Sequence, residues 1–168
     1  MLSLTLGIII LAMSMARSPF EIAKVFLGVI VGTFILDSEY ILYSYIFEPN
    51  TDFAKSIFAY IKSKDFGGVI GFINEHKDEV KEKSLNSVLF QVVLIFVVVF
   101  VSYTRTSYFI KAFVLSIFAN SIYKLIECFL DGDTKDWFWA IKGTPKRESV
   151  LLLIIALVAV LGLALYFV

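Results

Sequence analysis

The stretch from Ser149 to Val168 reads SVLLLIIALVAVLGLALYFV and contains no charged residue. The hydrocarbon core of a bilayer is about 30 Å thick, so a helix needs about 20 consecutive apolar residues to cross it. This stretch has that length and that composition. It therefore predicts a membrane-spanning helix.

The composition of the whole chain agrees with this prediction. Of its 168 residues, 59% are hydrophobic and only 18% are charged, with a mean hydropathy of +0.85. A soluble domain of this size needs more polar residues to cover its core. The net charge at pH 7 is zero, so no basic surface favours a nucleic acid. We expect the lipid bilayer as the main partner and no nucleic-acid binding.

Four apolar runs precede the last one, so we expect about five transmembrane helices. The first run has no Lys or Arg before it, as a signal peptide would, and we interpret it as a short retained span. The sequence thus predicts an all-α, polytopic membrane helical bundle that forms a single integral membrane domain over residues 1–168. The expected spans are 2–16, 20–47, 86–103, 108–130 and 149–168.

A polar segment, residues 48–85, separates the second expected span from the third. Apolar residues recur in it at helical spacing, with an acidic residue near the start of each series, which predicts two short amphipathic helices. We expect a helical insertion here that contacts a protein partner or the membrane surface. The first stripe consists of Phe53, Ile57 and Tyr60, and the second of Val69, Ile73, His76 and Val80.

Basic residues set the expected orientation. Lys and Arg are more numerous in 48–85 and 131–148 than in the segments that five spans would place on the other side. This bias predicts that both segments are cytoplasmic, in a multi-pass protein of the plasma (inner) membrane. In the second segment, Trp137, Phe138 and Trp139 are expected at the membrane surface, where aromatic side chains gather.

The fourth expected span carries a polar stripe. Its members follow one another at steps of three or four residues, which places them on one face of a helix. Charged side chains near the centre of a membrane helix cost about 2.5–3.5 kcal/mol each, so they normally face the bundle interior and find partners there. The stripe consists of Ser116, Asn120, Lys124, Glu127 and Asp131.

Two further groups of polar residues are expected to join this stripe in a polar core. Asn86, Ser87 and Gln91 open the third expected span, where such residues usually form hydrogen bonds between helices. Asp37 and Glu39 lie in the second span, and we expect at least one of them to pair with the Lys124 ammonium. The expected polar core is Asp37, Glu39, Asn86, Ser87, Gln91, Asn120, Lys124 and Glu127.

The order of these positions resembles an inner-membrane family of metal-dependent hydrolase-like proteins. That family has P-D-x-D in an early span, H-R-G-x-T-H-S opening a middle span, and H-x-x-x-D in a later one. Here the first motif reads Leu36-Asp37-Ser38-Glu39, and the second falls on KEKSLNSVL. In the third motif, Asn120 replaces the histidine and Lys124 replaces the aspartate.

The resemblance implies a divalent metal, which would be held by Asp37 and Glu39. However, the histidines of both later motifs are missing, and the ammonium of Lys124 would stand near the site. We therefore favour a protein without a cofactor, a divergent member in which Lys124 takes the electrostatic role of the metal.

Three functions follow from these patterns. The favoured one is a non-catalytic binding or assembly protein, either a homo-oligomer or the subunit of a partner that contacts 48–85. The second is a membrane-embedded metal-dependent hydrolase of a lipid or lipid-linked substrate, with Asp37, Glu39 and Glu127 as catalytic candidates. The third is an oligomer that conducts ions or protons, because aligned charged residues inside a membrane can mark such a pathway.

Overall fold

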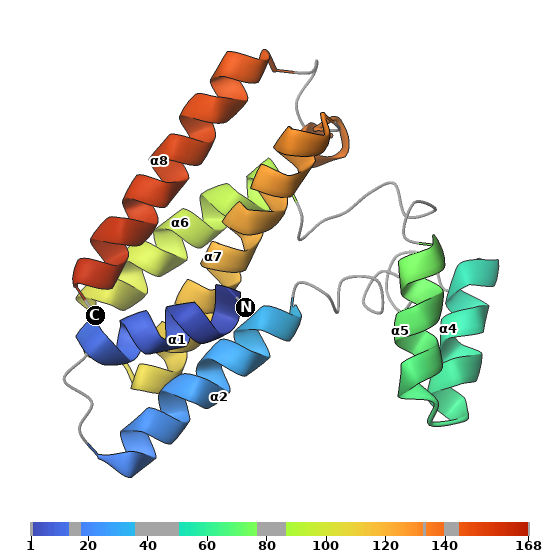
Figure 1. Ribbon diagram of the computed structural model, residues 1–168, viewed down its shortest axis with the longest axis horizontal. Helices are drawn as coiled ribbons and strands as arrows, with labels where there is room; N and C mark the ends of the chain where they lie inside the picture. The colour runs from blue at the N-terminus through green and yellow to red at the C-terminus, as the bar shows by residue number, and fades with distance from the viewer. Residues whose placement is uncertain are drawn as a thin grey trace. The chain divides into compact units, whose positions relative to one another are not determined.

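The structure, a computed structural model, describes residues 2–13, 18–35, 51–76, 87–132, 134–139 and 145–167. These residues form helices and turns, with no strand among them, so the all-α prediction is confirmed (Figure 1). The chain forms two compact units. The first comprises Met1–Leu36 and Leu85–Val168, and the second Asp37–Ser84.

The helices of the first unit lie where the sequence predicts apolar runs. The second expected span reached residue 47, whereas α2 is described only to its end at Ile35. The helices are α1 (Leu2–Met13), α2 (Pro19–Ile35), α6 (Val88–Tyr103), α7 (Tyr108–Asp131) and α8 (Arg147–Tyr166), with a short 3-10 helix, η2 (Asp136–Phe138), before the last.

Local sequence signals mark several helix ends. At the start of α2, the Ser18 hydroxyl accepts from the Glu21 backbone N–H at 3.3 Å, and the Ser18 N–H donates to the Glu21 carboxylate at 3.4 Å. This reciprocal capping box satisfies two of the donors that a helix start leaves open. The C-terminal end of α7 is marked by a glycine. The helix ends at Asp131, and the next residue, Gly132, has a φ of 78°, a left-handed conformation that favours glycine.

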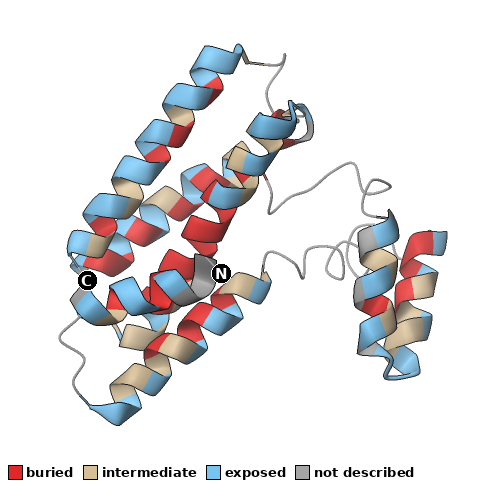
Figure 2. Cartoon of the chain, viewed as in Figure 1, coloured by how far each residue is buried: buried red, intermediate tan, exposed pale blue. Residues whose placement is uncertain are grey.

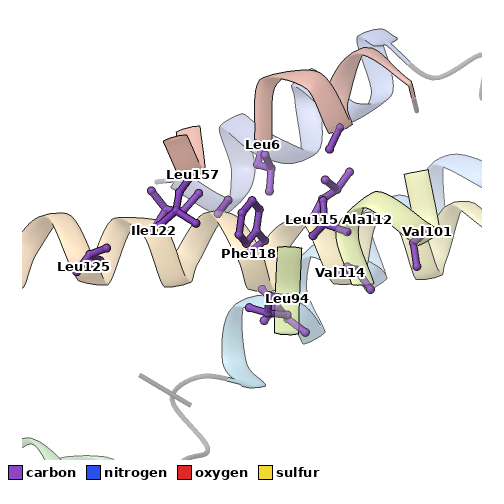
Figure 3. Close-up of a cluster of buried hydrophobic side chains, with 14 of the residues drawn as sticks. Leu6, Leu94, Val101, Ala112, Val114, Leu115, Phe118, Ile122, Leu125 and Leu157 are labelled. Atoms are coloured by element: carbon purple, nitrogen blue, oxygen red, sulfur yellow. The ribbon is translucent and has the colours of Figure 1, made fainter. Parts of the chain in front are cut away.

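Helix α7 is the centre of the first unit, because α1, α2, α6 and α8 all pack against it (Figure 1). Its middle is buried on nearly every side, whereas α6 and α8 each bury one stripe (Figure 2). Phe118 of α7 is completely buried. Figure 3 shows Leu6 of α1, Leu94 of α6 and Leu157 of α8 in the cluster around Phe118 and Ile122.

Contacts along α7 fix the directions of its neighbours. Gly28 of α2 lies against Phe109 of α7, and Thr33, further along α2, lies within 3.5 Å of Asn120, so the two helices are parallel. Gln91, near the start of α6, lies within 3.4 Å of Ser121, whereas α6 ends only five residues before α7 begins, so α6 is antiparallel to α7. The end of α2 and the start of α6 consequently meet the same turn of α7.

Among the described helices, two are long and apolar enough to cross a membrane, namely α7 and α8. At 1.5 Å per residue, their 24 and 20 residues extend about 36 and 30 Å. Helix α6 is apolar but has 16 residues, about 24 Å, and α1 has 12, about 18 Å. Five expected spans thus correspond to five helices, of which two reach the full length within the described residues.

The second unit contains a pair of helices, α4 (Asp52–Lys62) and α5 (Phe66–His76). The prediction of two short helices here is confirmed. Phe53 and Ile57 of α4 are buried, and the Phe53 ring contacts that of Phe72 with centroids 5.5 Å apart. Asp65 caps α5, because its carboxylate accepts from the Gly68 N–H at 2.9 Å.

The aromatic residues before α8 differ from expectation. Trp137 and Phe138 are only 3% and 6% exposed and belong to the main apolar cluster, while Trp139 is 47% exposed. Two of these three rings therefore anchor η2 to the helix bundle and are not available to lipid. Only Trp139 keeps the exposure that a membrane-surface role requires.

Replacing Phe118 by Ala should lower the free energy of unfolding by about 3–5 kcal/mol, because it opens a cavity at the centre of the bundle. The matched control is Phe96→Ala in α6, whose side chain is 72% exposed. This control should change stability by no more than about 0.5 kcal/mol. Denaturant titration of the detergent-solubilised protein measures both. Equal losses for the two variants would contradict the position of α7 at the centre.

Candidate functional site

Helices α2 and α7 approach each other closely enough for their backbones to touch. A Cβ atom added to Gly28 would lie 2.5 Å from the Phe109 carbonyl oxygen and 3.0 Å from the Phe113 nitrogen. A Cβ added to Gly32 would lie 2.6 Å from the Phe113 oxygen. Real Cβ atoms are not found this close to a backbone. Both positions therefore require glycine for the two backbones to touch.

Small residues face one another across this contact. Gly28 and Gly32 are four residues apart on α2, and the Cβ positions of both lie next to Ala112 or Ser116, which are also four residues apart on α7. This is the small-xxx-small pattern by which helices approach closely in membranes. The pattern GVIVG at 28–32 carries that signal in the sequence. Hydropathy does not reveal this signal, because it reflects the polarity of side chains and not their size.

Polar side chains continue this contact toward the end of α2, and we name them the polar seam. The Ser116 hydroxyl donates across the interface to the Val29 carbonyl at 3.0 Å. The Thr33 hydroxyl donates to the same carbonyl at 2.7 Å and lies 3.3 Å from the Ser116 hydroxyl. The seam consists of Thr33 of α2, Gln91 of α6, and Ser116, Asn120 and Ser121 of α7.

Asn120 closes the seam on the α2 side. Its Nδ2 atom donates to the Ser116 carbonyl at 2.9 Å, with longer contacts of 3.4 Å to the Ser116 hydroxyl and 3.5 Å to the Thr33 hydroxyl. The residue is 8% exposed. The amide thus supports the serine and threonine that join the helices, which is the glue role expected of buried polar residues in membrane bundles.

Gln91 extends the seam to the third helix. Its Nε2 atom lies 3.3 Å from the Ser121 hydroxyl and 3.4 Å from the Ser121 carbonyl, and the residue is 1% exposed. The predicted role in hydrogen bonding between helices is confirmed for this residue. Ser87 has a different role. It caps α6, and its hydroxyl accepts from the Phe90 N–H at 3.3 Å.

The charged part of the stripe leaves the interior. Lys124 is half-buried, and Glu127 and Asp131 are exposed. Tyr123, one turn before Glu127 on the same helix, is also exposed. Glu127 is therefore not in the buried core that the sequence predicted. The polar residues of α7 do share one face of the helix. This face is covered by α2 at Ser116 and Asn120 and is exposed at Glu127 and Asp131.

Three members of the expected polar core, Asp37, Glu39 and Asn86, lie outside the described residues. The pairing of Asp37 or Glu39 with Lys124 stays a prediction.

Two described residues stand at motif positions of the family that the sequence resembles. Asn120 stands where that family has histidine, and its Nδ2 atom donates to the Ser116 carbonyl, while Lys124 brings a positive charge where that family has a carboxylate. Within the described ranges no three His, Cys, Asp or Glu side chains gather into a possible ligand set. What the seam does is hold α2, α6 and α7 together.

Comparison with known protein families, curated proteins and solved structures finds no match for this chain. Its function must therefore be argued from the geometry of the seam and the faces of the helices.

Gly28→Ala should destabilise the protein by about 1–3 kcal/mol, because the new methyl group meets backbone atoms that cannot move aside. Gly162→Ala is the matched control, since a Cβ there meets no atom within 4 Å on α8. The control should leave stability unchanged or raise it by up to about 1 kcal/mol, as alanine is the better helix former. Thermal unfolding in detergent compares the two. A Gly28 variant as stable as the control would refute the close contact.

Proposed function

We propose that this chain is a multi-pass integral membrane protein whose helical bundle is embedded through α1, α2, α6, α7 and α8, and that it acts as a non-catalytic binding or assembly protein. The observation that carries the membrane part is the distribution of side chains in α6. The buried side of this helix carries the polar residues Gln91 and Ser102. Its exposed side chains from Val88 onward are all apolar or aromatic: Leu89, Val92, Val93, Phe96, Val97, Val99, Phe100 and Tyr103.

Helix α8 also exposes apolar side chains. Leu152, Ile155 and Leu163 are 67%, 56% and 62% exposed, and no charged residue follows Glu148 in this helix. Water would penalise this surface by about 25 cal/mol for each Å² of apolar area. Contiguous exposed apolar surface of this extent marks a site of interaction. Lipid tails are a partner that fits every side of such a bundle.

Aromatic residues support an interface at one end of the bundle. Tyr103 ends α6, and its ring lies 4.7 Å from that of Phe167, just after α8. Tyr103 and Tyr166 are 68% and 74% exposed. Exposed Tyr side chains at helix ends are typical of the boundary between the hydrocarbon core and water. The end of the bundle formed by Tyr103, Tyr166 and Phe167 is named the aromatic end below.

The two long connections leave the bundle away from the aromatic end. Helix α2 ends and α6 begins beside Asn120 and Ser121, in the middle of α7. The Arg147 guanidinium lies 5.0 Å from the ring of Phe129, near the end of α7. These positions support placing both connections on one side of the membrane. Their excess of lysines supports the cytoplasmic side.

The seam supports the non-catalytic part of the proposal. Ser116, Thr33 and Asn120 are bonded to one another or to the Val29 and Ser116 carbonyls. A catalytic group needs to be within reach of a substrate, in a geometry that can exchange protons with it. These side chains instead occupy a helix contact with no room for a side chain at Gly28 or Gly32.

Single-cysteine labelling tests membrane embedding and sidedness. With Cys128→Ser as the background, Lys62→Cys and Lys146→Cys should react with an impermeant maleimide only after the membrane is opened, and Arg105→Cys should react in intact cells. All of the protein should resist alkaline extraction. Release by alkali would overturn the embedding, and labelling of all three sites in intact cells would overturn the sidedness.

The resemblance to metal-dependent hydrolases supplies the alternative, a metal held by Asp37 and Glu39. Elemental analysis of detergent-purified protein separates the two proposals. We expect no stoichiometric Zn, Mn or Mg in the wild type. The control is Asp52→Asn, which removes a carboxylate from the exposed start of α4. A metal present in the wild type and in this control but lost in Asp37→Asn would replace the non-catalytic proposal with the hydrolase.

A further inference from the structure

The exposed apolar surface of α6 is shorter than the hydrocarbon core of an ordinary bilayer. It begins at Leu89 and ends at Tyr103, a length of about 21 Å at 1.5 Å per residue. The helix does not continue past it, because Ser87 and Thr104 cap its two ends in extended conformations. The sequence before Ser87 reads KEKSLN, and residues 104–107 read TRTS. Polar sequence therefore bounds this surface on both sides.

Helix α8 carries an apolar surface of similar length. The helix has 20 residues, but residues 147–149 of its first turn are polar and exposed. Its exposed apolar side chains begin at Leu151, and from there to Tyr166 the helix extends about 23 Å. The Tyr103 ring lies 4.7 Å from that of Phe167, next to Tyr166. The apolar surfaces of α6 and α8 therefore stop together at the aromatic end.

The charged residues of α7 mark out a similar length. No charged residue lies between Lys111 and Lys124, which are about 20 Å apart along the helix. Lys124 follows Ser121, which contacts Gln91 near the start of α6. Because α6 is antiparallel to α7 and begins just before Gln91, the last turns of α7 extend beyond it. The exposed Glu127 lies in these turns.

Three helices thus agree on an apolar surface about 20–23 Å long, whereas the hydrocarbon core of a typical bilayer is about 30 Å thick. Tilting a helix shortens its projection on the membrane normal, so tilt makes the mismatch larger. Long basic side chains can reach outward from a membrane helix to water. This does not remove the mismatch at α6, because its caps, Ser87 and Thr104, have short side chains.

We infer that the bundle fits a thin bilayer, and that the lipids it prefers as neighbours are phospholipids with short acyl chains. A bilayer of ordinary thickness must become thinner around a short apolar surface, which costs free energy for each Å of mismatch. Short acyl chains remove this cost. The inference rests on the proposed membrane embedding and adds to it the thickness of the membrane.

Thermal unfolding in lipid vesicles tests the inference. The full chain with Trp139→Phe keeps only Trp137, which is 3% exposed in the apolar core, so its fluorescence reports the loss of packing. The vesicles contain dimyristoleoyl, dioleoyl or dierucoyl phosphatidylcholine, in order of increasing chain length. We expect the highest unfolding temperature in dimyristoleoyl vesicles and a value at least about 5 °C lower in dierucoyl vesicles.

Two matched double variants change the length of the α8 surface or only its charge. Arg147→Leu with Glu148→Leu lengthens the surface to about 29 Å, with Ser149 as the one polar residue left in it. Arg147→Gln with Glu148→Gln removes the same charges and keeps the length. The leucine pair should narrow the difference between dimyristoleoyl and dierucoyl vesicles, and the glutamine pair should retain it.

An unfolding temperature that does not depend on chain length, or that is highest in the longer lipids, overturns the inference. An equal response of the two double variants does so as well. If either double variant does not fold, the profile of the Trp139→Phe chain decides alone. A chain that resists alkaline extraction but shows no chain-length preference loses only this inference, whereas release by alkali removes the membrane proposal itself.

Discussion

The bundle depends on the contact between the backbones of α2 and α7. Inside a bilayer the hydrophobic effect does not press helices together, because lipid tails are as apolar as the side chains. In the proposed membrane-embedded bundle, association would therefore come from close packing and from hydrogen bonds between helices. Gly28 and Gly32 permit the approach, since any side chain there would meet the Phe109 or Phe113 backbone. The Ser116 hydroxyl reaches the Val29 carbonyl at 3.0 Å only because the helices are so close.

This contact orders the other helices. With α2 held on one side of α7, the opposite sides of α7 receive α1, α6 and α8, which together enclose Phe118. Gln91 and Ser121 repeat the hydrogen-bonding principle on the α6 side. Each such bond contributes about 1 kcal/mol or less in a membrane. These bonds therefore determine the alignment of the helices more than they add to the stability of the bundle. They fix which turn of α6 faces which turn of α7.

The sequence predicted the helices well but the site only in part. Long apolar runs and the spacing of Phe53 and Ile57 identify helices directly, because burial and helical period are both local properties. The role of Gln91 was also accessible, since a buried amide must find a partner. The glycine contact was missed because hydropathy ignores size. Glu127 was placed in the core because a helical wheel does not show where a neighbouring helix stops covering the stripe.

Trp137 and Phe138 show a further limit of sequence reasoning. An aromatic pair near a span has the same composition whether it faces lipid or closes the core, and only the return of the chain after Gly132 decides between them. Their burial is a tertiary effect, set by how η2 folds back against the bundle.

The parallel arrangement of α2 and α7 has a consequence for how the chain can vary. Helix α2 ends at Ile35, and α6 begins just after Ser87. Because these two helices contact α7 at the neighbouring residues Asn120 and Ser121, the chain between α2 and α6 starts and ends at nearby points of the bundle. Closing a flexible loop costs entropy that grows only with the logarithm of its length, about 0.6 kcal/mol for each doubling. A change in the length of the chain between α2 and α6 that leaves the α4–α5 pair intact therefore costs little closure entropy, while a single methyl group at Gly28 costs about 1–3 kcal/mol.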